Sequence, residues 1–394
     1  MIDSIWNVPN WARYVCCGFC ISFLLSTKVR AQLVPTDSTP KQGIQNTVLP
    51  AVGYTSDLGL IGGGIYSRFD YRPGVNPYYS KIQAMVLAST GGYLEGELHM
   101  DWCKTFGLDM RSTLEFGANR LFDDNYFGVG NSTDFKDNRW NNGYYYFETV
   151  NFNADYTGRI PVWKSTFDDR LNALLMAGSE YNIPYPRKDQ STINLMPPRG
   201  VSGGWVNYIG TGLLWENRDS EIHPTRGNRV ELKFKAAPSV LFNEYPLSIA
   251  KLDAREYFKF HLLRDVVVAN RLIMRHANGQ VPYWEMSALG NRTIMRGMPM
   301  NRYLGNSMIV YSLELRTWLI NIKEYQVKLG GQLFADRGRV FTPGDDFQDI
   351  FHNYRRTYGL GGAISLFNPD LIFRGDLGFS KDIMRIYMGI GYAF

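Results

Sequence analysis

The sequence contains little cysteine. Only four of its 394 residues are cysteine, and Cys16, Cys17 and Cys20 all fall within the first 31 residues. Beyond that segment only Cys103 remains. The bulk of the chain therefore has no internal disulfide framework and no cysteine-based metal site.

The chain also lacks a strong charge of either sign. Its formal net charge is +5, and 39 basic residues face 36 acidic residues once residues 1–31 are set aside. Nucleic-acid binding needs a clear excess of basic residues on one face. We therefore expect no nucleic-acid partner.

Long hydrophobic runs are missing as well. The most apolar stretch, residues 14–25, is shorter than the roughly 20 residues that a membrane-spanning helix needs. It follows Arg13 and precedes Val29-Arg30-Ala31, the order of a signal peptide with a small-residue cleavage site. We expect a signal peptide at residues 1–31, a short flexible lead at 32–53, and the folded domain at 54–394.

Aromatic residues and glycine are plentiful, with 25 Tyr, 23 Phe, 9 Trp and 39 Gly. The chain is nonetheless mildly polar overall. An outer-membrane β-barrel needs this combination, because it has an apolar outer face, aromatic girdles and a polar lumen. On composition alone, an array of soluble β-sandwiches remains the alternative.

Two-residue alternation of apolar and polar side chains runs from about residue 58 to the end, and no stretch keeps a helical period over a dozen residues. Residues 229–234 are an example, since Val230, Leu232 and Phe234 alternate with three charged residues. Fifteen runs of about ten residues, separated by turn residues, predict strands. They are 58–71, 79–90, 93–105, 108–121, 144–156, 170–181, 205–216, 228–240, 247–260, 265–275, 307–319, 326–341, 354–366, 371–379 and 385–394.

A closed antiparallel barrel whose two ends lie on one side of the membrane has an even number of strands. We therefore predict an all-β, transmembrane antiparallel β-barrel of sixteen strands. We expect the sixteenth strand between Gly143 and Gly203.

Several motifs stand in a fixed order along the second half of the chain. Residues 215–227 read WENRDSEIHPTRG, residues 294–298 read IMRGM, residues 312–315 read SLEL, and residues 334–338 read FADRG. The first motif contains Arg218, Asp219, Pro224, Thr225, Arg226 and Gly227, which form a hairpin according to the family resemblance given next.

In order and spacing, these motifs resemble those of the BamA/TamA family of outer-membrane barrels, the bacterial surface antigen superfamily. The resemblance covers the chain after about residue 50. It implies an extracellular loop folded into the barrel, with Arg296 and Gly297 at its tip. Met298 stands where the family usually has an aromatic residue.

The resemblance further implies that Arg296 pairs with Glu314 and Asp336 on the barrel wall, close to Gly338. Such a loop lock makes physical sense, because a guanidinium in a partly dehydrated lumen needs carboxylate partners and its planar fork can serve two of them. The alternative is that the three side chains line a wet lumen and are solvated separately.

The two ends of the predicted barrel carry further signals. Tyr392 and Phe394 close an alternating run and resemble the C-terminal sorting signal of outer-membrane barrels. Gly62, Gly63 and Gly64 lie in residues 58–71, the expected first strand, where glycine weakens pairing. We hypothesise a weak seam between this strand and residues 385–394 that allows lateral opening.

Barrel-building members of the family carry polypeptide-transport-associated (POTRA) domains ahead of the barrel, and 53 residues are too few for one. We therefore expect a form without these domains, whose partners supply the periplasmic functions. The predicted location is the outer membrane of a Gram-negative bacterium, where the expected partners are outer-membrane lipid, client or partner outer-membrane proteins and periplasmic accessory proteins.

The function that the resemblance implies is insertion of outer-membrane proteins or protein translocation. The alternative is a structural subunit: a closed barrel that acts as a scaffold in an outer-membrane complex. A passive pore is disfavoured, because the inward loop would obstruct it.

Nothing in the sequence predicts an enzyme, a cofactor or a metal site. Residues 200–204 match G-x-S-x-G, but Pro197-Pro198 precede them and a predicted strand follows, whereas a nucleophile elbow lies between a strand and a helix. The five histidines have no metal-binding spacing; they are His99, His223, His261, His276 and His352.

Overall fold

The computed structural model describes residues 42–75, 77–164, 170–185, 190–322, 327–345, 347–366 and 372–394. The expected signal peptide, with Cys16, Cys17 and Cys20, and the first part of the expected lead lie outside the described residues. None of the helices in the described ranges is both long and apolar enough to cross a membrane.

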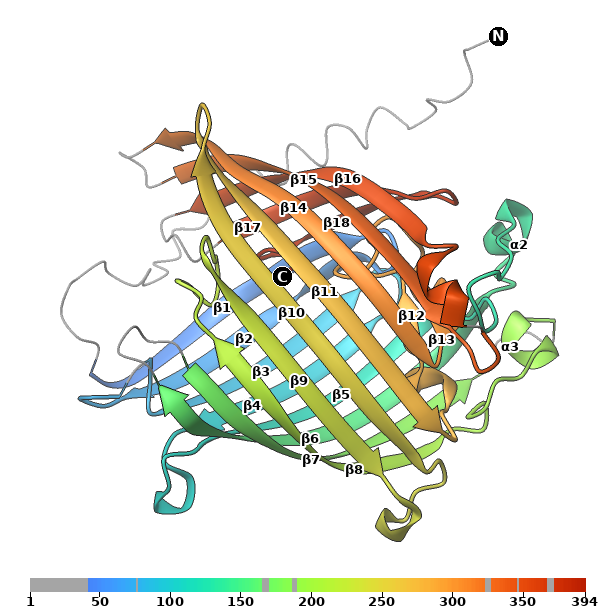
Figure 1. Cartoon of the computed structure of the whole chain (residues 1–394), viewed down its shortest axis with the longest axis horizontal. Coiled ribbons are helices and arrows are strands. Elements are labelled where there is room, and N and C mark those ends of the chain that lie inside the picture. Colours follow the sequence, from blue (N-terminus) through green and yellow to red (C-terminus); the bar gives the residue numbers. More distant parts are fainter. Residues whose placement is uncertain are drawn as a thin grey trace. The chain divides into compact units, whose positions relative to one another are not determined.

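In the part of the chain that the structure describes, sixteen strands close into an antiparallel barrel (Figure 1). Each strand pairs with its neighbours in sequence, except that β11 pairs with β14 and the barrel closes between β18 and β1. The strands of the barrel are β1 (Gly43–Thr55), β2 (Gly59–Tyr71), β3 (Ser80–Ser89), β4 (Leu94–Trp102), β5 (Arg111–Asn125), β6 (Tyr146–Lys164), β7 (Arg170–Tyr185), β8 (Gly204–Glu216), β9 (Gly227–Ala237), β10 (Leu247–His261), β11 (Asp265–Gly279), β14 (Ser307–Ile322), β15 (Val327–Phe341), β16 (Arg355–Leu366), β17 (Ile372–Phe379) and β18 (Met384–Ile390).

Short elements lie in the connections. They are η1 (Thr105–Gly107), α2 (Asp137–Asn141), α3 (Thr192–Leu195), η2 (Ser239–Leu241), η3 (Tyr283–Glu285), η5 (Phe347–Phe351) and a two-stranded sheet of β12 (Ser287–Leu289) and β13 (Tyr303–Gly305). We call the end of the barrel where β1 begins and β18 ends the terminal end. The opposite end is the loop end.

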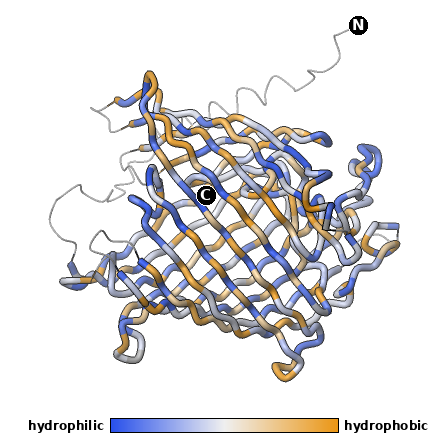
Figure 2. Tube along the Cα trace, viewed as in Figure 1, coloured by the Kyte–Doolittle hydropathy of each residue, from blue (hydrophilic) through white to orange (hydrophobic). Residues whose placement is uncertain are grey.

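Period-two alternation separates the two faces of the wall, and the hydropathy of the trace alternates along the strands in Figure 2. In β9, Leu232 and Phe234 are exposed on the outer face. Between them, Lys233 points into the lumen and its Nζ lies 2.7 Å from Glu231. The sequence therefore produces an apolar outside and a charged inside, as a membrane barrel requires.

Aromatic pairs mark both edges of the apolar outer face on β6–β8. Trp163 and Trp215 stack with ring centroids 5.9 Å apart towards the terminal end. Tyr181 and Trp205 stack at 4.4 Å towards the loop end. Such pairs are the aromatic girdles that sit at the two interfaces of a membrane.

The predicted total of sixteen strands is confirmed, but the location of the missing strand was wrong. It is β1, Gly43–Thr55, which lies mostly in the segment 32–53 expected to be a flexible lead, and not between Gly143 and Gly203. Residues 58–71 thus contain the second strand. β1 pairs with β2 along its whole length, from Gly43↔Tyr71 to Thr55↔Gly59, so the strand depends on a partner that its own sequence does not reveal.

The predicted last strand, residues 385–394, is also too long. β18 ends at Ile390, and Gly391 adopts a positive φ of 78° while its N–H bonds to the Ile372 carbonyl. The chain then turns inward, where Ala393 and Phe394 are buried. Alternation therefore continues to the last residue, although the strand does not.

We predict that Gly63 and Gly64 of β2 respond differently to an added methyl group. A Cβ on Gly63 would lie 2.0 Å from the Val86 carbonyl oxygen, whereas on Gly64 it would meet nothing within 4 Å. Gly63→Ala should therefore lower the free energy of unfolding by about 1–3 kcal/mol, the usual cost of overpacking. Gly64→Ala is the matched control and should be neutral in the same urea titration of the folded barrel; equal losses in both variants would contradict this packing.

Candidate functional site

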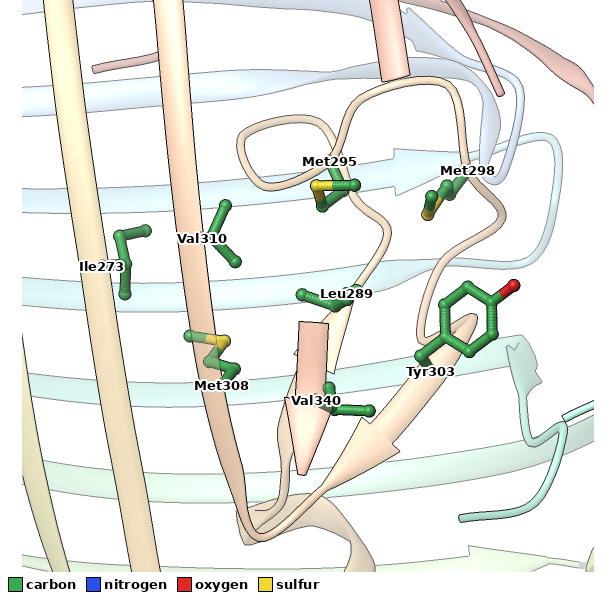
Figure 3. Close-up of a cluster of buried hydrophobic side chains, with 8 residues drawn as sticks. All are labelled: Ile273, Leu289, Met295, Met298, Tyr303, Met308, Val310 and Val340. Atoms are coloured by element: carbon green, nitrogen blue, oxygen red, sulfur yellow. The ribbon is translucent and has the colours of Figure 1, made fainter. Parts of the chain in front are cut away.

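The connection between β11 and β14, residues 280–306, folds into the barrel and packs against its wall. Met295 and Met298 of this inward loop are buried against Val310 and Val340, which belong to β14 and β15 (Figure 3). Leu289 and Tyr303, from β12 and β13, complete the contact with Ile273 and Met308 of the wall. An apolar cluster therefore holds the loop inside the lumen.

Arg296 lies within the loop and is completely buried. Its Nη1 donates to Glu314 Oε1, and its Nη2 lies 3.4 Å from Asp336 Oδ1. The backbone N–H of Arg296 also donates to Asp336 Oδ2, at 3.1 Å. The guanidinium carbon lies 3.6 Å from the centre of the Phe334 ring. The structure thus brings together the three charged residues of the expected lock, rather than leaving them separately solvated.

Further charges surround this group. Arg296 Nη1 lies 3.7 Å from Asp376 Oδ2, and Arg374 Nε lies 3.2 Å from the same oxygen. Arg316 Nε donates to Glu314 Oε2 at 2.7 Å. Three arginines and three carboxylates are therefore buried together with no formal net charge. This balance limits the free-energy cost of removing six charges from water.

Sequence reasoning missed Arg316, Arg374 and Asp376. A signal was present, since Arg316 is two residues after Glu314 and Arg374 is two residues before Asp376. Residues spaced by two share a face of a strand. A charge that repeats at this spacing in an apolar strand could have identified all three.

Gly297 allows the loop to approach the wall closely. Its φ is +99°, and a Cβ there would lie 2.6 Å from the backbone of Gly378 in β17. The N–H of Gly297 donates to the hydroxyl of Tyr387 in β18 at 3.1 Å, and that hydroxyl donates to the Met298 carbonyl at 3.3 Å. The loop tip therefore contacts the backbone of one strand and a side chain of the next.

Gly338 lies beneath the loop on β15. A Cβ at this position would approach both Met295 Sδ and Val310 Cγ2 to 3.0 Å. The fifth residue of the expected lock thus makes room for the buried loop without itself bonding to Arg296.

The last residues reach the same network from another direction. Arg316 Nη2 donates to an oxygen of Phe394 at 2.8 Å, and its guanidinium carbon lies 4.1 Å from the centre of the Tyr392 ring. Phe394 packs with Tyr257 and Ala269 of the wall. Tyr392 and Phe394, expected as a sorting signal, thus lie on the lumen side in the folded barrel, and their role in sorting stays a prediction.

The hairpin motif forms the turn between β8 and β9. Asp219 accepts hydrogen bonds from the backbone N–H groups of Thr225 and Arg226, at 2.8 and 3.2 Å. Burial raises the pKa of Asp219, but a hydrogen bond from the Thr225 hydroxyl, together with the backbone bonds, outweighs it and holds the pKa below its usual value. Gly227 has a φ of +95°, and a Cβ there would meet the Asn217 carbonyl oxygen at 2.3 Å.

Two further residues of the motif take part in this turn. Arg218 makes a bidentate pair with Glu216, with bonds of 2.6 and 2.8 Å. Pro224 lies inside the loop that Asp219 closes. The motif therefore builds a rigid turn at the terminal end and lies on different strands from the Arg296 network.

The barrel closes through very few residue pairs. In the described chain, β1 and β18 share only Tyr54↔Met388 and Thr55↔Tyr387 in register, against thirteen pairs between β1 and β2. Ser56 adds a backbone bond to Ile386 at 2.9 Å. Arg385 Nη2 lies 3.4 Å from Asp57 at the loop end of the seam.

Two other patterns lead to no site. Residues 201–202 form a turn and strand β8 follows from Gly204, so the G-x-S-x-G match lacks the strand-turn-helix geometry of a nucleophile elbow. Among the described residues, no three His, Cys, Asp or Glu side chains gather where they could hold a metal ion.

We predict that Arg296→Met lowers the free energy of unfolding by about 3–5 kcal/mol, because it leaves buried carboxylates without their partner. Urea unfolding of the folded barrel measures the loss. The double variant Arg296→Met/Asp336→Asn should recover part of it, since one uncompensated charge is removed with the arginine. A single variant as stable as the parent protein would favour separate solvation of the three side chains.

The close approach of Gly297 to β17 predicts that alanine is tolerated less well at this position than at a glycine with a similar φ and open space around it. Gly297 and Gly344 have similar φ values, +99° and +105°, but a Cβ on Gly344 would meet nothing within 4 Å. Replacing either residue by alanine carries the cost of a left-handed backbone, about 1–2 kcal/mol. Gly297→Ala should lose about 1–3 kcal/mol more, through its clash with β17. Equal unfolding midpoints of the two variants would exclude the close approach.

Comparison with known proteins agrees with the fold and the motifs. A model of the Omp85 superfamily domain matches residues 111–394, well over half of the chain. The fold is similar to that of BamA from Haemophilus ducreyi lacking POTRA domains 1–3, with a TM-score of 0.61 and 13% identity. That match covers 88% of this chain and 70% of the other. No curated protein matches the chain.

The fold is also similar to CdiB from Acinetobacter baumannii and CdiB from Escherichia coli, each with 11% identity and a TM-score of 0.57. These matches cover 89% and 90% of this chain, which spans only 60% and 64% of the two CdiB chains. At such identities the structures show the fold alone. With the family match they lead to one conclusion: the chain belongs to the Omp85 superfamily and is an outer-membrane β-barrel of a family whose members are non-enzymatic protein insertases and transporters.

Proposed function

We propose that this barrel takes part in inserting proteins into the outer membrane or translocating them across it, by opening between β1 and β18. The observation that carries the proposal is the seam of two residue pairs. Partner proteins on the periplasmic side would deliver the clients.

The edge of β1 that faces away from β2 is unpaired over most of its length, and this supports a mechanism in which a strand of a client protein pairs with it. From Gly43 to Ala51 this strand pairs only with β2 in the described chain, because β18 ends at Ile390, which the seam register places opposite Val52. Ile44, Val48 and Val52 are exposed on the outer face. An unpaired strand edge can add another strand through main-chain hydrogen bonds. Pro50, within β1, is typical of such an edge.

The few contacts across the seam gather at its loop end. Arg385 Nη1 donates to the Ser56 carbonyl at 3.1 Å, beside the ion pair of Arg385 with Asp57. Opening would therefore begin at the terminal end, where β1 is free. The Arg296 network, which holds β14, β15 and β17 together, would keep the rest of the barrel in register as the seam opens.

A disulfide across the seam tests this function. Tyr54 and Met388 lie directly opposite each other, so Tyr54→Cys/Met388→Cys, with Cys103→Ser, would lock the barrel closed. We expect that cells relying on the locked variant lose unrelated barrel proteins from purified outer membranes, as quantitative proteomics measures, and recover them when the disulfide is reduced.

The matched control is Tyr66→Cys/Ala84→Cys, a directly opposed pair between the fully zipped strands β2 and β3, again with Cys103→Ser. This disulfide should leave the outer-membrane proteins unchanged. If the seam-locked variant also supports normal levels, opening is not needed and the proposal is wrong.

The alternative is a scaffold subunit with a closed barrel. One observation favours it: the loop between β9 and β10 presents Val240 and Phe242 to solvent, with Phe242 91% exposed. Bonds between Asn243 and Asn207 hold this loop in shape. A rigid apolar tip suits a docking contact. If cells are depleted of this protein, a scaffold role predicts that only one or two proteins are lost from the outer membrane.

A further inference from the structure

Two arginines lie opposite each other on the outer wall of the barrel. Arg337 of β15 pairs in register with Arg356 of β16, and both side chains are exposed. Residues directly opposite in an antiparallel pair have Cβ atoms only about 4.5–5.5 Å apart, and like charges there repel each other. The pair is thus an unfavourable arrangement unless something else binds it.

No carboxylate in the described part of the chain forms an ion pair with either arginine, although most arginines of the lumen have one. Arg337 is instead packed over the ring of Tyr354, at 4.7 Å. Arg339 follows on the same face of β15, where it is buried and donates to the His352 carbonyl at 2.7 Å.

The position of the pair indicates what it meets. Towards the terminal end, the outer face of β16 continues from Arg356 with Tyr358, Leu360 and Ile364, all exposed. Tyr358 stacks on Phe379 of β17, with ring centroids 5.8 Å apart. The arginines therefore lie at the loop-end edge of the apolar band, just beyond an aromatic pair. Lipid headgroups occupy this level of a membrane.

We propose that Arg337 and Arg356 bind the phosphate group of a membrane lipid at the loop-end edge of the outer wall. Two planar guanidinium groups on neighbouring strands offer several N–H donors to one phosphate, and arginine binds phosphate in a bidentate manner. A bound phosphate would turn the repulsion between the arginines into attraction for a common partner. The lipid's acyl chains would lie along Leu360 and Ile364.

Lipid titration tests the site. Native mass spectrometry of the full chain in a non-ionic detergent would measure binding of phosphatidic acid, with phosphatidylcholine as the neutral lipid. We expect Arg337→Gln/Arg356→Gln to weaken phosphatidic acid binding about tenfold or more, as expected for the loss of charge-assisted hydrogen bonds. Binding of phosphatidylcholine should not change.

Arg68→Gln is the matched control. Arg68 is also an exposed arginine on the outer wall, but it faces Asn46 and Ile82 instead of another arginine. This variant should bind phosphatidic acid like the parent protein. Equal binding by the double variant and the parent protein would overturn the proposal, as would an equal loss in Arg68→Gln. Displacement of the lipid by inorganic phosphate would show a general anion site instead.

Stability gives a second readout, which the single variant Arg356→Gln can supply if the double variant does not fold. In phosphatidylcholine vesicles, Arg356→Gln should unfold at the same or a higher urea concentration than the parent protein, because repulsion is relieved. Added phosphatidic acid should raise the unfolding midpoint of the parent protein more than that of the variant. An equal rise in both proteins would overturn the proposal.

Discussion

The structure depends on burying one positive charge. Arg296 lies in the lumen against the barrel wall, out of contact with water, and a guanidinium in that environment is tolerated only with carboxylate partners. Those partners come from three strands: Glu314 of β14, Asp336 of β15 and Asp376 of β17. One loop residue therefore links three strands of the wall, and these strands in turn hold the loop.

The same network reaches the last strand twice. Through Gly297 the loop bonds to Tyr387, which is itself one of the two β18 residues in register with β1. Through Arg316, which shares Glu314 with Arg296, the network holds Phe394 beyond the end of β18. β18 is thus anchored from within the lumen and from β17, and only weakly by β1. An opening at this seam would leave these inner anchors of β18 in place.

The sequence predicts well what depends on local spacing and poorly what depends on the path of the chain. Period-two alternation identified fifteen strands, and the motifs indicated that Arg296, Glu314 and Asp336 lie together. β1 was missed because Pro50 interrupts it and because nearly all of its pairing comes from β2. The inward turn at Gly391 was missed for a different reason: alternation indicates which face a residue occupies, and not whether its strand continues.

Buried and lipid-facing arginines of this barrel meet the same electrostatic requirement in different ways. Within the Arg296 network, the positive charges of Arg296, Arg316 and Arg374 are balanced by three side-chain carboxylates. On the outer wall, Arg337 follows Asp336 by a single residue, and period-two geometry sends the two side chains to opposite faces. A slip of β15 by one residue would place Arg337 beside Arg296 and put the Asp336 carboxylate on the outer face. Charged side chains on both faces of the wall therefore specify the register of β15. On the outer face, the positive charges of Arg337 and Arg356 are balanced only by an anion from the membrane.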